Sequence, residues 1–531
     1  SLANDQRGHL GSDTGGKAAT LAAMAERGGL DPDLGYWAER WDPDGRVHPL
    51  LFISHLGDRW VDATTMPMLV AAYPLYRIGG YRLALLLPMV GAVLAALAAR
   101  ALARRLGGGG GWTAFWVIGL ASPVAVYALD LWEHTFGVAA MAWGVVFLVD
   151  LVQGRRGWPA ALAGGLAFGA AATMRTEALV YAAVAVAATG VVLLARRRVV
   201  LALASGVLAA VGLVVPIVLN TALEVATVGQ TIRSGRAAGT VAVAGVEGGL
   251  RLREAAVTAL GFLPSSDPVS WLLGLILLVL LGFSLRRLAG PGDPGPAVLA
   301  LVAATALYLL RLAGGPGYVP GLIPAAPLAV LGLVLGWRVP AARQVLAIGL
   351  AALPLVWATE FVGGGVPQWG GRYVLTSGLL FANVGCVALP SLRPWAGRVV
   401  VGLAVVVTGL GLTFLSVRSH GFGRAGAELA GSPEPVLVSR VVQLAREGGV
   451  TSSHHRWLTA ATLADQRVAV DVVRRAGFTR FGLVTPEGEA VPAVDGWHAV
   501  AHRRVPITLG AALRVTTFEP APAQRGVVAG R

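Results

Sequence analysis

Long apolar runs, separated by short polar or arginine-bearing segments, dominate the chain between residues 81 and 417. Many of these runs approach the roughly 20 residues that a helix needs to cross a lipid bilayer. The short pair at 159–174 and 178–195 also fits a broken or re-entrant feature. The pattern predicts a polytopic α-helical membrane protein with about twelve spans, at 81–103, 112–129, 135–152, 159–174, 178–195, 199–220, 269–285, 296–313, 318–336, 344–361, 373–391 and 399–417.

The segments that flank this core follow other patterns. The first segment is polar to about residue 66, and the apolar stretch that follows, at 67–80, is too short to cross a bilayer and contains two prolines. This stretch predicts a helix that lies along the membrane surface. The predicted domains are a first extracytoplasmic loop with interfacial helices at 1–80, a membrane core at 81–417 that includes an outer loop at 221–268, and an extracytoplasmic α/β domain at 418–531.

The C-terminal segment alternates between strand-like and amphipathic helix-like patterns, with glycines at the stops. Strands are expected at 434–439, 480–486 and 512–520, and helices at 438–449 and 463–478. No glycine-rich dinucleotide fingerprint follows the first of these strands, so a dinucleotide-binding function is not expected.

Composition and charge support the membrane assignment. The chain is 55% hydrophobic and 14% charged, whereas soluble domains carry about 25% charged residues. The net charge of +14 comes from arginine clusters that recur after every second span, as the positive-inside rule requires of cytoplasmic loops. No stacking aromatics interleave these clusters, so the charge indicates topology at the plasma membrane and not nucleic-acid binding. The clusters are Arg100/Arg104/Arg105, Arg155/Arg156, Arg196/Arg197/Arg198, Arg286/Arg287, Arg338/Arg343 and Arg393/Arg398.

One short motif, GSDTGGK at residues 11–17, resembles a phosphate-binding loop of nucleotide hydrolases. Ala18 takes the place of the magnesium-binding Ser or Thr, and no buried strand precedes the motif, so an ATP site is not expected. The candidates within the motif are instead Asp13 and Lys17, the only lysine of the chain, on a glycine-rich turn before a helical run. Most other acids of the first loop, Asp62 among them, fit a solvated loop with Asp/Gly turns.

Three further places on the predicted outer face carry ionisable residues, which are functional candidates near a membrane. The hairpin tip LDLWEHTFG contributes Asp130, Glu133 and His134, and a hydrated helix end is the alternative interpretation of this tip. Glu133 and His134 are weak candidates for binding a divalent metal together with an acid of the first loop, although no HExxH motif or Cys/His pair is present.

The other two places are dominated by arginine. Arg175 and Glu177 interrupt apolar sequence, and an ion pair that turns the chain is the alternative to a functional role. Arg372 lies at the outer end of a span, where it opposes the positive-inside trend and requires an anionic partner. That partner is a protein carboxylate, a lipid headgroup or a lipid phosphate, and a phosphate suits the forked donors of arginine.

Five stretches in this order, covering roughly residues 10–390, resemble the GT-C superfamily of membrane glycosyltransferases: SDTGGK, GDRWVDATTMPMLVAAYPLYRIGG, LDLWEHT, MRTEALV and WGGRYVLTSGLL. The resemblance is to bacterial enzymes of the protein mannosyltransferase and aminoarabinose transferase type. It implies an inverting transfer of a hexose or pentose from a polyprenyl-phosphate donor to a glycan, lipid or protein acceptor of the cell envelope. The arginine-, alanine-, glycine- and valine-rich composition is typical of a high-GC bacterium, for which mannose or arabinose donors in cell-wall biogenesis are expected.

The resemblance also implies roles for individual residues. Asp13 becomes the base for the acceptor hydroxyl, and Asp130 or Glu133 becomes the second acid, which aids acceptor or metal binding. Lys17, Arg175 and Arg372 become ligands of the donor phosphate. The resemblance fixes no cofactor: these cations, or a divalent metal at Glu133 and His134, offset the charge of the departing phosphate.

The sequence departs from the family pattern in three respects, and two rival functions are also compatible with it. VDATTMP stands where the family has a Pro-Pro-Gly segment, the family has a spanning helix before its first-loop aspartate, and the α/β tail lies outside the shared core. The main rival function is a transporter or flippase of lipid-linked glycans, and the second is a membrane scaffold. The one-sided clustering of charges and the lack of an evident inverted repeat favour the enzyme.

Overall fold

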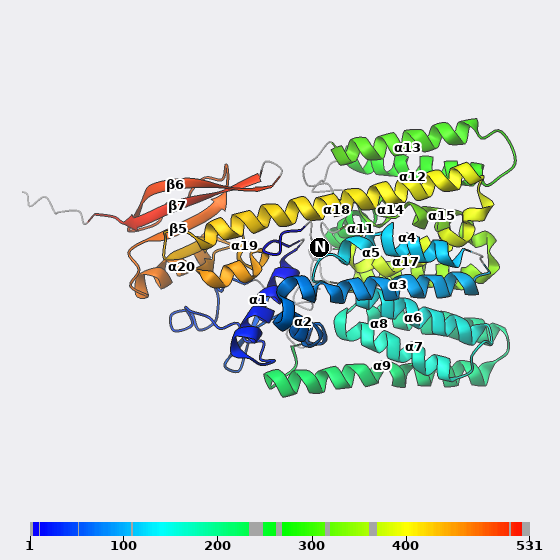
Figure 1. The fold of residues 1–531 in the computed structure, drawn as a ribbon, viewed down its shortest axis with the longest axis horizontal. Helices are drawn as coiled ribbons and strands as arrows, with labels where there is room; N and C mark the ends of the chain where they lie inside the picture. The colour runs from blue at the N-terminus through cyan, green and yellow to red at the C-terminus, as the bar shows by residue number, and fades with distance from the viewer. Residues whose placement is uncertain are drawn as a thin grey trace, which may run out of the picture.

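The computed structural model describes residues 4–9, 11–50, 52–107, 110–232, 248–261, 268–313, 319–360, 369–508 and 511–522. A bundle of roughly parallel and antiparallel helices forms one end of the elongated molecule, and a β-sheet domain forms the other (Figure 1). The first loop lies between the bundle and the sheet domain, so segments from the beginning and the end of the chain are neighbours there.

The bundle confirms the polytopic helical class. By length and composition, seven described helices are able to cross a membrane: α3 (Leu86–Arg105), α6 (His134–Val152), α8 (Ala178–Ala195), α9 (Val199–Val228), the segment Pro340–Thr359 with α16 (Arg343–Thr359), the segment Arg372–Ser391 with α17 (Leu375–Ala388), and α18 (Pro394–Ala430). The remaining helices of this region are α4 (Gly111–Leu120), α5 (Pro123–Tyr127), α7 (Pro159–Met174), α11 (Gly248–Leu260), α12 (Pro268–Leu288), α13 (Gly295–Ala313), α14 (Leu322–Ala325) and α15 (Pro327–Leu335). Each predicted span overlaps at least one of these helices, while the count of twelve crossings stays a prediction.

Two predicted spans are broken by proline. Pro123 begins α5 after α4 has ended, and the Ser122 hydroxyl caps the new helix by accepting from the Val124 amide. Pro327 begins α15 directly after α14. Proline fits the first helical turn because it has no N–H to leave unpaired. The predicted pair at 159–174 and 178–195 consists of two separate helices, α7 and α8, joined by the turn at 175–177.

The two ends of the bundle differ in charge. Helix α6 begins at the end near the sheet domain and finishes at the opposite end, which we call the distal end (Figure 1). All six predicted arginine clusters fall on helix ends and connections at this distal end. The predicted outer tip, the turn at 175–177 and the start of α17 fall at the other end, as the predicted alternation requires.

Helix α18 continues past the predicted end of the last span at residue 417 and runs to Ala430 as one helix of 37 residues. The described residues after it, which we call the tail domain, form a mixed five-stranded sheet in the order β4-β3-β5-β7-β6. Strands β3, β4 and β5 are parallel, and β7 is antiparallel to both β5 and β6. The strands are β3 (Val436–Ser439), β4 (Arg456–Thr459), β5 (Phe481–Pro486), β6 (Trp497–Thr508) and β7 (Ala511–Pro520).

The sequence pattern predicted β3, β5, β7 and the helix α20 (Leu463–Arg475), and these are confirmed. The helix predicted at 438–449 is wrong in extent: only the single turn α19 (Leu444–Glu447) forms, followed by the 3-10 segment η5 (Gly449–His454). Two glycines end α19 after one turn, since Gly449 has a φ of +52°. Strands β4 and β6 were not predicted.

The first loop contains α1 (Ser12–Arg27), a hairpin of β1 (Ile53–Leu56) and β2 (Arg59–Asp62), and α2 (Met66–Ala84). The apolar stretch at 67–80 is helical, with non-helical geometry at Gly79 and Gly80. The loop and the tail domain share one hydrophobic cluster, in which Tyr36 and Trp60 pack with Phe481 and other tail residues. The amide of Thr459 donates to Val47 O at 2.9 Å, so the first loop also pairs with β4.

Candidate active site

The first turn of α1 carries the residue at the centre of the site. GSDTGGK is a helix start and not the expected glycine-rich turn: Gly11 is extended, with φ −154°, and α1 begins at Ser12. Asp13 in the first turn is favoured by the positive end of the helix dipole. A Cβ on Gly15 would lie 1.8 Å from the Arg446 carbonyl oxygen, and one on Gly16 would lie 2.5 Å from an Asp62 carboxylate oxygen. The two glycines therefore permit the close approach of α19 and β2 to α1.

Asp13 lies between two arginines that come from different segments, Arg372 at the start of the α17 segment and Arg446 in α19 of the tail domain. Arg446 Nη1 is 2.8 Å from Asp13 Oδ1, and Arg372 Nη2 forms a close ion pair with Asp13 Oδ2. Arg446 also donates from Nε and Nη2 to the two carboxylate oxygens of Asp62, at 3.0 Å each. The Asp13 side chain is 21% exposed, whereas Arg446 and Asp62 are at most 2% exposed, so Asp13 is the carboxylate of this group that reaches solvent.

Lys17 and Arg175 hold the second carboxylate of the site from two sides. Lys17 Nζ is 2.8 Å from Glu133 Oε2, and Arg175 Nη1 is 3.3 Å from Glu133 Oε1. Arg175 Nε also lies 2.8 Å from Glu177 Oε1, so the ion pair expected at the 175–177 turn is present together with the long-range contact. A Cβ on Gly137 would lie 2.6 Å from Arg175 Cγ, which shows how closely the arginine stem lies along α6.

Two consecutive glycines aim Arg372 into the site. Gly370 and Gly371 have φ values of +75° and +72°, which disfavour a side chain. A Cβ on Gly370 would also lie 2.5 Å from Pro123, and one on Gly371 would lie 2.5 Å from the Thr258 carbonyl oxygen. The anionic partner that the sequence required for Arg372 is thus a protein carboxylate, Asp13.

The face of Arg372 is covered by aromatic rings. Its guanidinium carbon lies 5.5 Å from the Trp132 ring centroid and 5.4 Å from that of Tyr373. Its Nε donates to His134 Nε2 at 3.0 Å. Cation–π contacts of this kind stabilise an arginine that is removed from water.

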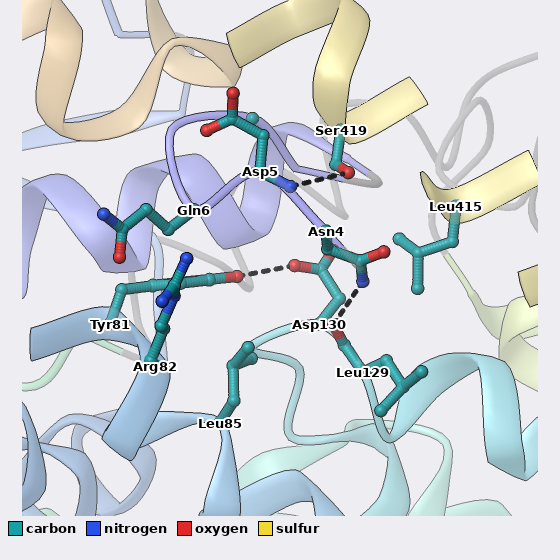
Figure 2. Close-up of a pocket in the computed structure, with 11 residues that line it drawn as sticks. Asn4, Asp5, Gln6, Tyr81, Arg82, Leu85, Leu129, Asp130, Leu415 and Ser419 are labelled. Carbon is teal, nitrogen blue, oxygen red and sulfur yellow. Dashed lines mark hydrogen bonds between the residues drawn. The ribbon is translucent and has the colours of Figure 1, made fainter. Parts of the chain in front are cut away.

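Asp130 forms a separate arrangement on the other side of Thr14. The Tyr81 hydroxyl donates to Asp130 Oδ1 at 2.7 Å, and the Thr14 hydroxyl donates to Oδ2 at 3.0 Å. Figure 2 shows the Tyr81 hydroxyl directed at Asp130 in a small pocket, which the polar side chains of Asn4 and Arg82 also line. Through Thr14, the residue that follows Asp13, Asp130 therefore joins α1 to the hairpin tip.

We call the eight ionisable residues of the main group the site cluster; they are Asp13, Lys17, Asp62, Glu133, Arg175, Glu177, Arg372 and Arg446. Four carboxylates thus face four cations. Burial alone would raise the pKa of Asp13, but the adjacent charges of Arg372, Arg446 and Lys17 hold that pKa well below its usual range. Burial opposes ionisation of Glu133 too, and Lys17 leads the charges that lower its pKa. Both carboxylates are therefore ionised at neutral pH.

Several buried hydrogen-bond donors around Arg372 have no partner within the described ranges. Arg175 Nη2, Trp132 Nε1 and the Tyr127 hydroxyl belong to this group. His134 Nδ1 does also, and it carries the imidazole proton when Nε2 accepts from Arg372. The ring centroid of His134 lies 4.7 Å from that of Trp132 and 5.1 Å from that of Tyr127. Unsatisfied buried donors next to two arginines suit an anionic group such as a phosphate.

The same residues do not supply a metal-ligand set. Across the described parts of the chain, no group of three or more His, Cys, Asp or Glu side chains is arranged to hold a metal ion. At the predicted place, the two Glu133 oxygens lie against Lys17 and Arg175, and His134 Nε2 accepts from Arg372.

Sequence reasoning brought together Asp13, Lys17, Glu133, His134, Arg175 and Arg372, and the structure places all six in one region. It missed Arg446, and it assigned Asp62 to a solvated loop. That assignment is wrong, because Asp62 is fully buried and accepts both bonds from Arg446. The available signal was that Asp62 ends a strand-like RWVD run and that Arg446 interrupts an apolar stretch of the tail.

The fold and site together describe a polytopic membrane protein with a charged site between its helical bundle and its tail domain. No protein-family model and no curated protein sequence matches the chain. Among solved structures, it is similar to ArnT from Cupriavidus metallidurans, in the apo state (TM-score 0.38) and bound to undecaprenyl phosphate (TM-score 0.37), each at 15% identity over 97% of this chain and 95% of that one.

It is also similar to the archaeal oligosaccharyltransferase AglB from Archaeoglobus fulgidus, in complex with an inhibitory peptide and a dolichol-phosphate. That similarity has a TM-score of 0.40 at 10% identity, over 88% of this chain and 68% of the other. Because these likenesses are low in both identity and TM-score, the chemistry of this chain is argued from its own residues.

Proposed function

We propose that this protein is an inverting glycosyltransferase that moves a sugar from a polyprenyl-phosphate donor to a hydroxyl of a cell-envelope glycan, lipid or protein. The observation that carries the proposal is the position of Asp13. Its ionised carboxylate reaches solvent between Arg372 and Arg446. Lys17 and Arg175 lie nearby, paired with Glu133, and buried hydrogen-bond donors that have no partner among the described residues surround them. This combination offers a base for a hydroxyl proton and cations for a phosphate in one place.

The chemistry assigns one task to each part of the site. The bond from the sugar C1 to the phosphate oxygen breaks, and polyprenyl phosphate leaves with the bonding electron pair and one additional negative charge. Cations placed where this charge develops lower the barrier. Asp13 accepts the proton of the acceptor hydroxyl, whose oxygen attacks C1 from the face opposite the leaving group. A single displacement of this kind inverts the configuration at C1.

Arg372 connects the two halves of this reaction. It pairs with Asp13 and lies next to the unsatisfied donors, so a donor phosphate that enters beside Trp132 and His134 would reach its guanidinium. Arg175 Nη2 has no hydrogen-bond partner among the described residues and is available to the same phosphate. Lys17 is held by Glu133, and its charge is available to the leaving group at short range. Glu133 thus orients the cations, and Asp130 supports the acceptor side.

The proposed orientation follows from the distal arginines. The positive-inside rule assigns the distal end to the cytoplasm, which leaves the site and the tail domain on the outer face of the plasma membrane. A lipid-linked donor would reach the site laterally from the membrane, and the acceptor would arrive from the outside.

The test is a donor-cleavage assay on the purified chain in lipid nanodiscs. Radiolabelled polyprenyl-phosphate mannose and arabinose are supplied in turn with a cell-envelope extract as acceptor, and release of free polyprenyl phosphate is measured. We expect release by the wild type and a loss of at least 1,000-fold in Asp13→Asn, because a carboxamide cannot accept the proton. Asp44→Asn, at an exposed acid of the same loop, is the matched control.

Two results would count against the proposal. Full activity of a folded Asp13→Asn protein would remove Asp13 from the reaction. Movement of intact donor between the leaflets of liposomes, without any cleavage, would identify the rival flippase instead.

A further inference from the structure

Arg446 belongs to the tail domain but occupies the centre of the site cluster. It is 1% exposed and is among the largest fully buried side chains of the protein. Its three guanidinium nitrogens all have partners on the first loop: Nε and Nη2 contact Asp62, and Nη1 contacts Asp13 and, at 3.4 Å, the Ser12 hydroxyl. A planar guanidinium that is fixed on one edge by a bidentate carboxylate presents its remaining donor in a defined direction.

The backbone around Arg446 is built for this contact. α19 is a single turn, and it packs directly on α1 because Gly15 and Gly16 leave room for the backbone and side chain of Arg446. The neighbouring Glu447 ties α19 to α18 through an ion pair with Arg418 at 2.7 Å. The hydrophobic cluster shared by the first loop and the tail domain holds the two segments together over a larger area.

Asp13 has two oxygens with different partners. Oδ1 is held by Arg446, and Oδ2 is held by Arg372. A phosphate that binds Arg372 competes with Asp13 for the same guanidinium, so Oδ2 is released toward the acceptor when the donor is bound. Oδ1 remains fixed, since Nε and Nη2 of Arg446 are both held by the buried Asp62.

We propose that Arg446 is a positioning residue for Asp13, which makes the tail domain a structural part of the active site and not a separate docking module. The Asp62–Arg446 pair holds the Asp13 carboxylate in place and keeps it ionised while Arg372 turns to the donor phosphate. This assignment rests on the proposed function for its catalytic consequence, but the contact itself makes predictions that need no turnover.

The relevant surroundings of Asp13 come from several elements. Arg372 and Tyr373 face it from the start of the α17 segment, Lys17 from α1, and Arg446 from α19. Behind these lie the carboxylates of Asp62 and Glu133 and the imidazole of His134. Loss of one of three cations raises the pKa of a carboxyl group by about 1 unit or more. Removal of the Arg446 charge should therefore move the protonation of Asp13 to higher pH.

The variants are chosen so that the protein still folds. Arg446→Gln alone would leave Asp62 buried without a counter-charge, so the main variant combines Arg446→Gln with Asp62→Asn, which keeps a neutral hydrogen-bonded pair. Arg446→Lys keeps the charge but loses the fork. Glu447→Gln breaks the adjacent Arg418 ion pair on the same helical turn without touching Asp13, and is the matched control.

The first readout does not depend on activity. A hydrophobic carbodiimide reacts with protonated carboxyl groups, so the pH dependence of Asp13 labelling, followed by peptide mass spectrometry on the full chain in nanodiscs, reports its protonation. We expect the labelling curve of the double variant to move up by about 1 pH unit, while Arg446→Lys and Glu447→Gln retain the wild-type curve. An unchanged curve in the folded double variant would overturn the proposal.

The second readout is the rate of polyprenyl phosphate release as a function of pH. For the double variant we expect kcat to fall at least tenfold, KM for the donor to stay within about threefold, and the acid limb to move to higher pH. Arg446→Lys should restore the acid limb but only part of kcat. A wild-type rate and pH profile in the double variant would overturn the proposal. A wild type that cleaves no donor, combined with a shifted labelling curve, would reject the proposed function and retain the contact.

Discussion

Helix α6 has a buried carboxylate at each end, and the two are held in different ways. Glu133 directly precedes the helix and is paired with Lys17 and Arg175, both 3% exposed. Asp150, in the last turn, is paired with Arg105 through two hydrogen bonds of 2.6 and 2.8 Å and with Arg156 at 3.4 Å. Arg105 is 16% exposed and Arg156 is 56% exposed, so the distal pair remains in contact with water.

The helix dipole accounts for the distal pair. A carboxylate at the C-terminal end of a helix is unfavourable, and cations at that end are favourable. Arg105 and Arg156 offset the charge of Asp150, and Arg105 also joins the end of α3 to the end of α6. This arrangement has a sufficient structural explanation.

The site cluster has no such explanation. Glu133 is already favoured by the N-terminal end of α6, yet two buried cations surround it. Within the described ranges, Nη2 of Arg175 has no hydrogen-bond partner. Burying charges costs free energy that even good pairing rarely recovers. Burial away from water and hydrogen-bond donors without a partner, more than the number of ion pairs, thus distinguish a functional charge cluster from a structural one.

The largest expected difference is in activity. Arg372→Gln should lower the rate of polyprenyl phosphate release by about 100- to 1,000-fold, the usual effect of removing one charge-stabilising donor. Arg105→Gln, the matched change at the distal end, should leave the rate within about threefold. Both rates are measured in the donor-cleavage assay, and equal losses in the two variants would remove the functional distinction between the ends.

The next effect is in stability. Glu133→Gln leaves Lys17 and Arg175 buried without their shared anion and should destabilise the fold by about 3–5 kcal/mol. Asp150→Asn should cost about 1–2 kcal/mol, because its arginines reach water and a hydrogen-bonded amide remains. Thermal unfolding in nanodiscs compares the two, and a larger loss at Asp150 would contradict the assignment.

The pH dependence of this loss has a defined sign. Lys17 and its neighbours lower the pKa of Glu133 below the ordinary value of 4.5. A carboxyl with a lowered pKa in the folded state contributes stability that is present above its unfolded pKa and is lost as pH falls toward the folded pKa. The difference in unfolding free energy between wild type and Glu133→Gln should therefore be constant from pH 6 to pH 8 and shrink below about pH 4.5.

Much of the bundle was predictable because its signals are local. Apolar run length located the helices, arginine spacing separated the two ends, and the isolated positions of Asp13, Glu133, Arg175 and Arg372 marked the site. Pro123 and Pro327 are visible in the sequence, but the sequence did not predict that each would begin a new helix within a single span.

The contacts that complete the site are not local. Arg446 and Asp62 lie 384 positions apart, and neither segment carries a sequence signal that identifies the other as its partner. The missed strand β4 and the shortened α19 have the same cause, because β4 bonds to Val47 of the first loop and α19 packs on α1. Strand β6 instead pairs with β7, the next strand along the chain.

The smallest expected effect concerns Asp130, a carboxylate at the same end of the bundle as the site cluster. It accepts hydrogen bonds from the neutral hydroxyls of Tyr81 and Thr14. Tyr81→Phe removes the 2.7 Å hydrogen bond to Asp130 Oδ1, but that oxygen still accepts from the Leu131 amide at 3.1 Å. The loss should be about 1 kcal/mol, with donor cleavage reduced less than tenfold. Tyr73→Phe, at a half-buried tyrosine whose hydroxyl accepts from the exposed Arg77, is the control and should change neither quantity. If Tyr81→Phe instead destabilised the fold as much as Glu133→Gln, burial alone and not the cations would govern the carboxylates at this end. The two ends of α6 would then be distinguished only by the buried donors around Arg372 that have no partner among the described residues.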